Sequence, residues 1–307
     1  MIGARDRCPA GGEPRHLGAV SAGRRFSGLL SGRRRYRVHS VFARALNLWD
    51  GREFLTFLPL SRGGGETCAT LALAPGESLL DFEVASGFEA QVHDGTRVRV
   101  GPGVIVDFSS SSMWESRLRD VRLLRLDETN LAVLRRTLLD SATASPFRGV
   151  IDGADSGLTE LLEGLRASVL EADQAGLGVA LESLVGFGPG LTPSGDDVVL
   201  GMSLARAVVR RARGRPGKGD ALWEAGVRGV LSRTHALSAF FIEEALSGKG
   251  HEFVEDALGC LFAGGPQETA LAAGRLIGLG ATSGFDIGMG LYLAAEWERG
   301  YAWCSGG

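Results

Sequence analysis

The residues best suited to chemistry in this sequence form a glycine-rich motif that is written twice. Residues 184–201 read LVGFGPGLTPSGDDVVLG, and residues 276–290 read LIGLGATSGFDIGMG. With a three-residue gap, the letters SGDD at 194–197 align with SGFD at 283–286, and each copy runs into an apolar segment with helical spacing. The repeat indicates a degenerate internal duplication in this part of the chain.

Two explanations of the motif are open. A serine followed three residues later by an acid, before an apolar run, is typical of a capping box that satisfies free backbone amides at a helix start. The first copy, however, contains more glycine and proline than a cap requires. Such a loop exposes successive N–H groups, and a helix N-terminus is a ready site for an oxyanion. We therefore favour a ligand site at 186–197 and weigh both explanations about equally at 280–286.

The polar side chains of the two copies suggest roles at such a site. Carboxylates and a hydroxyl are the candidate catalytic groups: Asp196, Asp197, Asp286 and Ser194. Loop glycines and hydroxyl donors are the candidate substrate-binding groups: Gly186, Gly188, Gly190, Thr192, Gly195, Thr282, Ser283 and Gly284.

Known phosphate loops and metal sites fit this motif poorly. No lysine lies in it, so it is no Walker A loop, and its glycines are spaced GxGxG instead of GxGxxG. Mg²⁺ could be held by one carboxylate together with substrate oxygens. Asp196 and Asp197 would point about 100° apart on a helix, so one site would use only one of them well. No metal ligands or other cofactor are assigned, and Mg²⁺ is left open.

The elements that must position these residues are strands first and helices second. From Tyr36 to about Phe108, short runs rich in Val, Phe, Leu and Thr are separated by Gly, Pro and Asp clusters, which is typical of strands. This pattern predicts a small β barrel or sandwich at 36–112. The expected strands are 36–42, 53–58, 67–73, 79–84, 96–100 and 103–108.

After residue 112 the apolar period changes from 2 to 3.6, which predicts a helical domain at 113–307. Strands followed by helices indicate an α+β fold. The expected helices are 129–140, 156–173, 197–213, 220–231, 235–246, 252–263, 267–277 and 286–298.

Composition limits the partners and the compartment. Residues 1–35 hold eight arginines against one Asp and one Glu, and we expect a disordered basic leader there. The whole chain carries a net charge of −3, which argues against a nucleic-acid partner. No apolar run reaches 18 residues, so no membrane partner is expected. The four scattered cysteines contain no CxxC spacing and suggest a reducing cytoplasm.

The segment GFGPGLTPSGDD (186–197) resembles the signature of a bacterial domain-of-unknown-function family that includes the AllH subunit of oxamate carbamoyltransferase. VHSVFARALNL (38–48) and GATSGFD (280–286) resemble further family segments, so the likeness covers about 36–298. It implies a transferase subunit of allantoin catabolism. That enzyme converts oxalurate and phosphate to oxamate and carbamoyl phosphate and involves other protein subunits.

The resemblance also implies roles for particular residues. Carbamoyl transfer passes through a species with oxyanion character. The reaction needs hydrogen-bond donors directed at the developing negative charge and backbone or side-chain groups that bind the phosphate. Asp197 or Asp286 could orient the carbamoyl NH₂, because a carboxylate only accepts hydrogen bonds. Further candidates for substrate binding are a polar pair in a middle helix and a pair that is either core or pocket edge: Thr234 with Ser238, and His39 with Ser40.

A different class of function remains open beside this one. The chain could be a non-catalytic assembly or metabolite-binding subunit whose glycine loops dock a partner or a regulatory ligand.

Overall fold

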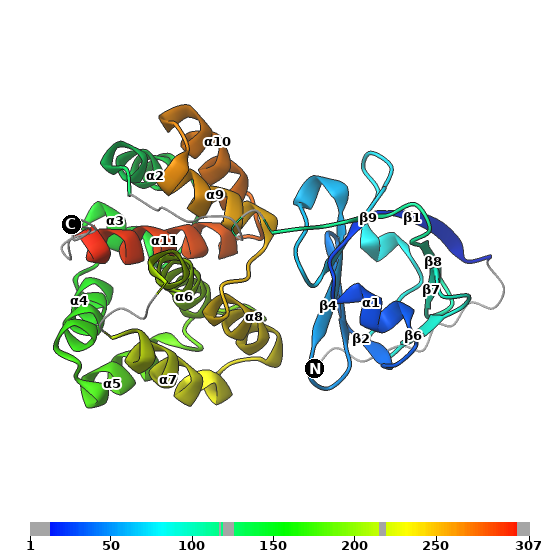
Figure 1. Ribbon diagram of the computed structural model, residues 1–307, viewed down its shortest axis with the longest axis horizontal. Helices are drawn as coiled ribbons and strands as arrows, with labels where there is room; N and C mark the ends of the chain where they lie inside the picture. The colour runs from blue at the N-terminus through cyan, green and yellow to red at the C-terminus, as the bar shows by residue number, and fades with distance from the viewer. Residues whose placement is uncertain (1–12, 117, 119–125, 215–218, 300–307) are drawn as a thin grey trace. The chain divides into compact units, whose positions relative to one another are not determined.

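The chain folds into two units, residues 1–115 and 116–307, and its computed structural model describes residues 13–116, 118, 126–214 and 219–299. The first unit is built mainly from strands and the second from helices (Figure 1). This order confirms the predicted α+β class, with an N-terminal β barrel followed by a mostly helical region. Within the described ranges, no helix is both long and apolar enough to cross a membrane.

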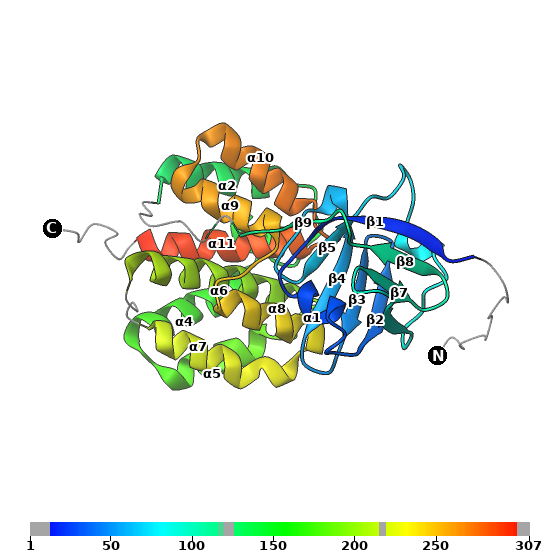
Figure 2. The same ribbon diagram turned by 45° about the vertical axis from the view of Figure 1, so that its right-hand side comes forward.

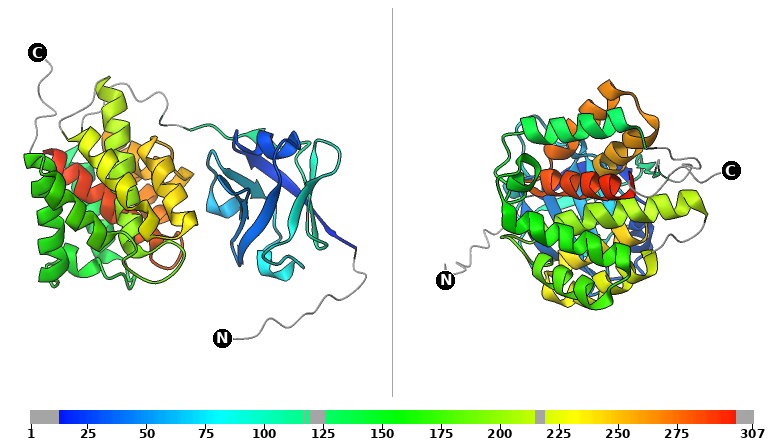
Figure 3. Two further views of the ribbon diagram at one scale, coloured as in Figure 1. Left: turned by 90° about the horizontal axis from the view of Figure 1, so that it is seen from below. Right: turned by 90° about the vertical axis from the view of Figure 1, so that its left-hand side faces the viewer.

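The strands of the first unit form one sheet that closes on itself and curves around its core (Figure 3). Its order is β5-β4-β3-β2-β6-β7-β8-β1-β9, and β1 also pairs with β5, where Ala19 lies opposite Leu71. Eight strands therefore make a barrel, and β9 is an extra strand beside β1. The strands are β1 (Arg15–Ala22), β2 (Tyr36–Phe42), β3 (Ala45–Trp49), β4 (Phe54–Pro59), β5 (Cys68–Leu71), β6 (Glu89–Val92), β7 (Arg97–Val100), β8 (Val104–Asp107) and β9 (Ser112–Met113).

The predicted disordered leader is wrong for the residues that the structure describes. Strand β1 and helix α1 (Phe26–Leu30) both lie inside 1–35, while residues 1–12 are outside the described part of the chain. Phe26 is fully buried, and its ring contacts those of Phe57 and Phe108 at 5.3 and 5.7 Å. The high arginine content of residues 1–35 obscured the strand pattern of β1. In this strand every second residue from Leu17 onward faces the core, until a bulge near Ser21.

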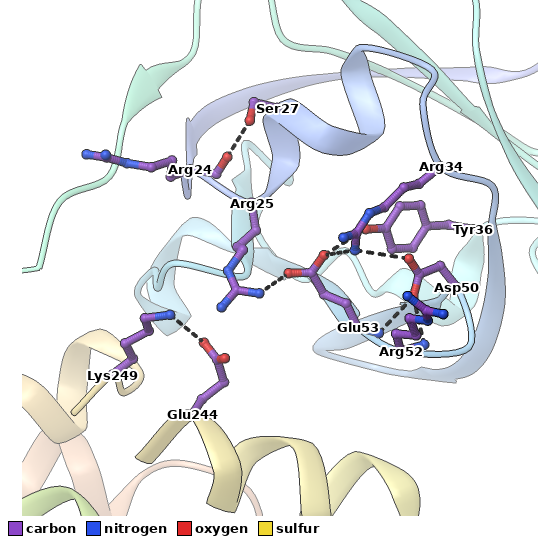
Figure 4. A network of polar contacts seen from close by, with 10 residues as sticks. All are labelled: Arg24, Arg25, Ser27, Arg34, Tyr36, Asp50, Arg52, Glu53, Glu244 and Lys249. Carbon is purple, nitrogen blue, oxygen red and sulfur yellow. Dashed lines mark hydrogen bonds and ion pairs between the residues drawn. The ribbon is translucent and has the colours of Figure 1, made fainter. Parts of the chain in front are cut away.

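Two of the leader's arginines belong to a charge network of the barrel (Figure 4). Glu53 lies between Arg25 and Arg34 and forms an ion pair with each of them, the latter at 2.7 Å. The Tyr36 hydroxyl donates to Glu53 at 3.1 Å, and Arg34 also reaches Asp50 at 3.2 Å. Burial, reinforced by the charge of Glu53, raises the pKa of the Tyr36 phenol, which stays a neutral donor.

The strand predictions fail where the local pattern is weak. Residues 79–84 form no strand, since Ser78 caps a short 3₁₀ turn, η2 (Leu79–Asp81), through a reciprocal hydrogen bond with Asp81. Strands β3, β6 and the two-residue β9 were not predicted, and β6 reads EAQV, which has little β propensity of its own. Pairing within the closed sheet, rather than local preference, makes these segments strands.

Every helix predicted from the sequence overlaps an observed one, and α1, α3 and α5 are additional. Helix α5 contains two glycines, which lowered its helical signal. The helices of the second unit are α2 (Glu128–Asp140), α3 (Arg148–Asp152), α4 (Ser156–Glu171), α5 (Gln174–Leu184), α6 (Ser194–Arg213), α7 (Asp220–Val230), α8 (Ala236–Leu246), α9 (Glu252–Ala263), α10 (Pro266–Ile277) and α11 (Ser283–Arg299).

Helix α6 is the centre of this unit, since residues 194–209 are all buried. It lies beside α11 (Figure 2), and the two backbones touch at Gly201 and Gly290. A Cβ on Gly201 would lie 2.2 Å from the Ile287 carbonyl oxygen, and one on Gly290 would lie 2.1 Å from that of Val198. Only glycine fits at either position, and these two residues set how closely the helices approach.

Replacing Gly201 by alanine should destabilise the chain by about 1–3 kcal/mol, because the helices must separate to admit the methyl group. Gly164 of α4 is the matched control: its Cβ would meet open space. Gly164→Ala should be neutral or stabilising by about 0.5–1 kcal/mol, the usual gain in helix propensity. Chemical denaturation followed by circular dichroism measures both, and equal effects would contradict the close contact.

Phe26→Ala should destabilise the chain by about 3–5 kcal/mol, because it empties a core position inside the segment predicted to be disordered. Leu80, which is 60% exposed, provides the control, and Leu80→Ala should change the unfolding free energy by less than about 0.5 kcal/mol. If Phe26→Ala were as mild as Leu80→Ala in denaturant unfolding, α1 would not be part of the barrel core.

Candidate functional site

The two glycine motifs share part of their local backbone structure, although Gly186 has a φ angle of 86° and its counterpart Gly278 one of −69°. Each connects the end of one helix to the start of the next, α5 to α6 and α10 to α11. Three backbone hydrogen bonds of the first copy have direct counterparts in the second. Phe187 N donates to Leu184 O (3.1 Å), as Leu279 N does to Leu276 O (2.9 Å). Gly195 N donates to Phe187 O, as Gly284 N does to Leu279 O (both 2.9 Å). Asp197 N donates to Pro193 O (3.1 Å), as Asp286 N does to Thr282 O (3.0 Å).

Two of the predicted substrate-binding glycines are buried by this backbone packing. A Cβ on Gly195 would lie 1.9 Å from the Leu184 carbonyl oxygen, and one on Gly284 would lie 1.8 Å from that of Leu276. Each helix therefore starts directly against the end of the helix before it. In the structure these glycines serve close backbone approach, a role that explains their presence without a ligand.

The capping-box explanation is wrong for the first copy. The N-cap of α6 is Pro193, which makes no side-chain cap, and Ser194 is the first residue inside the helix. Neither Asp196 nor Asp197 reaches back to the cap, and both are buried, at 0% and 2% exposure. The acidic side chains of the motif are thus directed into the protein and not toward the amides that a cap would satisfy.

Asp196 holds the glycine loop in place. One carboxylate oxygen accepts a hydrogen bond from the Gly186 amide at 2.7 Å, and the other accepts one from the Thr234 hydroxyl. Thr234 precedes α8, so the predicted polar residue of the middle helix does reach the motif. With both oxygens engaged, Asp196 connects the loop after α5 to the segment before α8.

Asp197 and Asp286 instead interact across the two helices. Ser283 of α11 hydrogen-bonds with Asp197, and Ser194 of α6 hydrogen-bonds with Asp286. The Thr192 hydroxyl lies 3.1 Å from that of Ser283, which joins the two motifs directly. The sequence predicted that two helix starts could share one site, and the structure does bring these residues together.

Ser145 is a site residue that the sequence analysis missed. It lies before α3, its hydroxyl donates to Asp286 Oδ1, and it accepts from the Phe147 amide at 2.9 Å. No motif surrounds it, and Ser145 is separated from Asp286 by 141 positions, so only the fold reveals the contact.

One oxygen of each aspartate has no hydrogen-bond partner. These atoms are Asp197 Oδ2 and Asp286 Oδ2, and both are buried. Burial raises the pKa of Asp197 well above its usual value; Ser283 offsets this in part, while the negative charges of Asp286 and Asp196 add to it. Burial likewise raises the pKa of Asp286 to about 6, against hydrogen bonds from Ser145, Ser194 and Thr282. Perturbed carboxyls of this kind gather at functional sites.

The first loop also contains backbone donors that have no hydrogen-bond partner among the described residues. Gly186, Gly188 and Gly190 are exposed and have positive φ angles of 86°, 110° and 98°, which other residues rarely adopt. Within the described residues, the amides of Gly188, Gly190 and Thr192 donate no hydrogen bond. Unsatisfied amides beside a helix start are the donors that an anion needs.

The remaining predicted site residues lie outside the two glycine motifs, His39 and Ser40 in β2 and Ser238 in α8. His39 and Ser40 belong to β2 in the first unit, where their side chains are 3.2 Å apart and Asn47 donates to Ser40 at 2.9 Å. Ser238 is buried in α8, one turn beyond Thr234. In the part of the chain that the structure describes, no group of three or more His, Cys, Asp or Glu side chains is arranged to hold a metal ion.

The raised pKa of Asp286 predicts a specific pH dependence. Between its ordinary value of 3.8 and about 6, the folded chain holds a proton that the unfolded chain has lost. The contribution of Asp286 to the unfolding free energy therefore falls as pH rises through this window, by roughly 3 kcal/mol in all. Asp286→Asn should gain most of that amount relative to the wild type between pH 4 and pH 7 in denaturant titrations. A difference that stays constant across this range would contradict a buried, protonated carboxyl.

Comparison with known proteins adds one match. No curated protein and no solved structure matches the chain. The family model described as oxamate carbamoyltransferase subunit AllH matches residues 184–295, which run from the end of α5 into α11 and include both glycine motifs. The match confirms the resemblance indicated by the motifs, and over these residues the chain is similar to the AllH subunit of oxamate carbamoyltransferase.

Proposed function

We propose that this chain is a subunit of an oxamate carbamoyltransferase-like enzyme, which transfers a carbamoyl group between oxalurate and phosphate. The observation that carries this proposal is the family match over residues 184–295, because it spans the whole of both loops and the starts of both helices. As a subunit, the chain would act together with partner proteins.

The anionic part of the ligand is assigned to the first glycine loop. Its free amides at Gly188, Gly190 and Thr192 point to a group that only accepts hydrogen bonds, such as a phosphate or a carboxylate. Helices α6 and α11 begin near each other, where the Thr192 hydroxyl just before α6 lies 3.1 Å from the Ser283 hydroxyl, and the positive ends of both helices favour negative charge there. In carbamoyl transfer the same donors would stabilise the developing oxyanion.

The three aspartates receive different roles in this proposal. Asp196 is a positioning residue, because both of its oxygens are engaged in holding the loop. Asp197 and Asp286 each keep one oxygen without a partner and are the groups that would contact the ligand. Ser194 and Ser283 hold these two carboxyls from the opposite helix.

We further infer that the two helix-loop-helix units arose by internal duplication. The matching backbone hydrogen bonds, the equivalent glycines at 195 and 284, and the reciprocal contact of Gly201 with Gly290 support this origin. In that case the candidate site lies on the axis that relates the two copies.

Ligand binding by the full chain tests the proposed function. Phosphate, carbamoyl phosphate, oxamate and oxalurate are each added in thermal unfolding experiments, and we expect at least one to stabilise the wild type. At 100 times its dissociation constant, a ligand should add about 2.7 kcal/mol. Ser194→Ala should weaken this response, because it removes the hydroxyl that holds Asp286.

Ser183→Ala is the matched control. Ser183 is an exposed serine of α5 whose hydroxyl donates only to the Val179 carbonyl, so the variant should respond like the wild type. If a correctly folded wild type responds to none of the four compounds, the chain does not bind the ligands of this reaction. It would then be better explained as an assembly subunit, and association with partner proteins would be the property lost in Ser194→Ala.

A further inference from the structure

The unpartnered oxygens of Asp197 and Asp286 distinguish them from the other acids of the motif. Both side chains are almost wholly inaccessible, at 2% and 0% exposure, and they occupy equivalent positions in the two copies. Buried polar atoms are nearly always hydrogen-bonded, so two equivalent exceptions in one place require an explanation. A ligand that supplies the missing partners to both atoms would provide it.

The two carboxyls differ in what they can offer such a ligand. Burial and the charges of Asp286 and Asp196 raise the pKa of Asp197 well above its ordinary value, and one hydroxyl, that of Ser283, opposes this rise. Three hydroxyls oppose the corresponding rise at Asp286, so the proton is assigned to Asp197. Near neutral pH Asp286 is ionised, because its pKa is about 6. A protonated carboxyl donates a hydrogen bond, and a carboxylate only accepts. The pair therefore presents one donor and one acceptor from adjacent helices.

We propose, resting on the function proposed above, that Asp197 and Asp286 together recognise the H₂N–C=O edge of a carbamoyl or carboxamide group. Asp197 donates to the carbonyl oxygen of the ligand, and Asp286 accepts from its NH₂ group. This edge is a small planar group that carries an acceptor and a donor side by side, so it complements both aspartates at once.

The two halves of the ligand bind to different groups of the protein in this arrangement. A phosphate or carboxylate has acceptors alone and would be repelled by Asp286, so the anionic half belongs at the free amides of Gly188, Gly190 and Thr192. Ser145 and Ser194 engage Asp286, and Ser283 engages Asp197, which fixes the carboxyl orientations before the ligand arrives. Preformed geometry of this kind favours discrimination between ligands of similar shape.

Matched ligands that differ by one group test the recognition directly. Pyruvate has a methyl group where oxamate has NH₂, and acetyl phosphate differs from carbamoyl phosphate in the same way. Titration calorimetry with the full-length wild type at pH 7.5 should show each methyl compound binding at least about tenfold more weakly, because Asp286 would be left without its donor. Asp286→Leu, which removes the acceptor and keeps a side chain of similar shape, should reduce this ratio toward one and change the affinity for inorganic phosphate only slightly.

Asp256→Asn is the control for removing a buried negative charge. Asp256 lies in α9, where Arg275 is 3.6 Å from its carboxylate, and its substitution should leave the tenfold ratio unchanged. A second readout concerns the proton itself: the infrared spectrum of the wild type at pH 7.5 should contain a buried carboxylic acid band that Asp197→Asn lacks.

Each contrary result has a distinct meaning. If the amide and methyl compounds bind equally well to the wild type, the aspartate pair does not read the NH₂ group, and only the proposed anion site at the loop remains. Failure of all four compounds to bind overturns both proposals. Stabilisation of the wild type by Mg²⁺ alone, lost in Asp197→Asn, would make the pair a cation site and would also overturn the recognition proposed here.

Discussion

The backbone contact between Gly201 and Gly290 is the constraint on which the candidate site depends. With no Cβ on either residue, α6 and α11 approach until the Cβ position of each glycine falls 2.1–2.2 Å from a carbonyl oxygen of the other helix. The two helices consequently start next to each other, and Thr192 meets Ser283 at 3.1 Å. Any side chain at either glycine would move apart the serines and aspartates that interact across the helices.

This arrangement brings two positive helix ends together, which is unfavourable unless negative charge is placed there. Asp286, which is ionised near neutral pH, provides that charge. Both Asp286 and Asp197 are buried, so their ionised forms lose hydration. The raised pKa of each carboxyl is the result of these opposing effects, in which desolvation exceeds the help from hydroxyl donors. The two carboxyls can hold one proton and one negative charge between them, and each keeps one oxygen that can still form a hydrogen bond.

The sequence predicts the place of the site better than the role of each residue in it. The repeated glycines and acids indicated two segments that the fold does bring together at Thr192 and Ser283, because glycine spacing and helix starts are local properties. The same letters SGxD, however, fit a capping box and a buried carboxyl equally well, and only the packing of α6 on α11 separates them. Adjacent Asp196 and Asp197 point in different directions on the helix, so one holds the loop while the other contacts Ser283. The folded leader was missed for a related reason, since β1 becomes a strand by pairing with β5 and β8, which lie far along the chain.

The site also extends beyond the segment that matches the known family. Asp286 lies within residues 184–295, but its donor Ser145 lies outside them, before α3. Without that hydroxyl, Asp286 Oδ1 would lose a partner, and both the charge state and the orientation of the carboxyl would change. The matched helices alone therefore do not complete the site, and the helices that precede them take part in its chemistry. Since Ser145 accepts from the Phe147 amide, and the Phe147 ring contacts that of Phe187 in the first glycine loop at 5.9 Å, one short segment connects the aspartate of the second copy to the loop of the first.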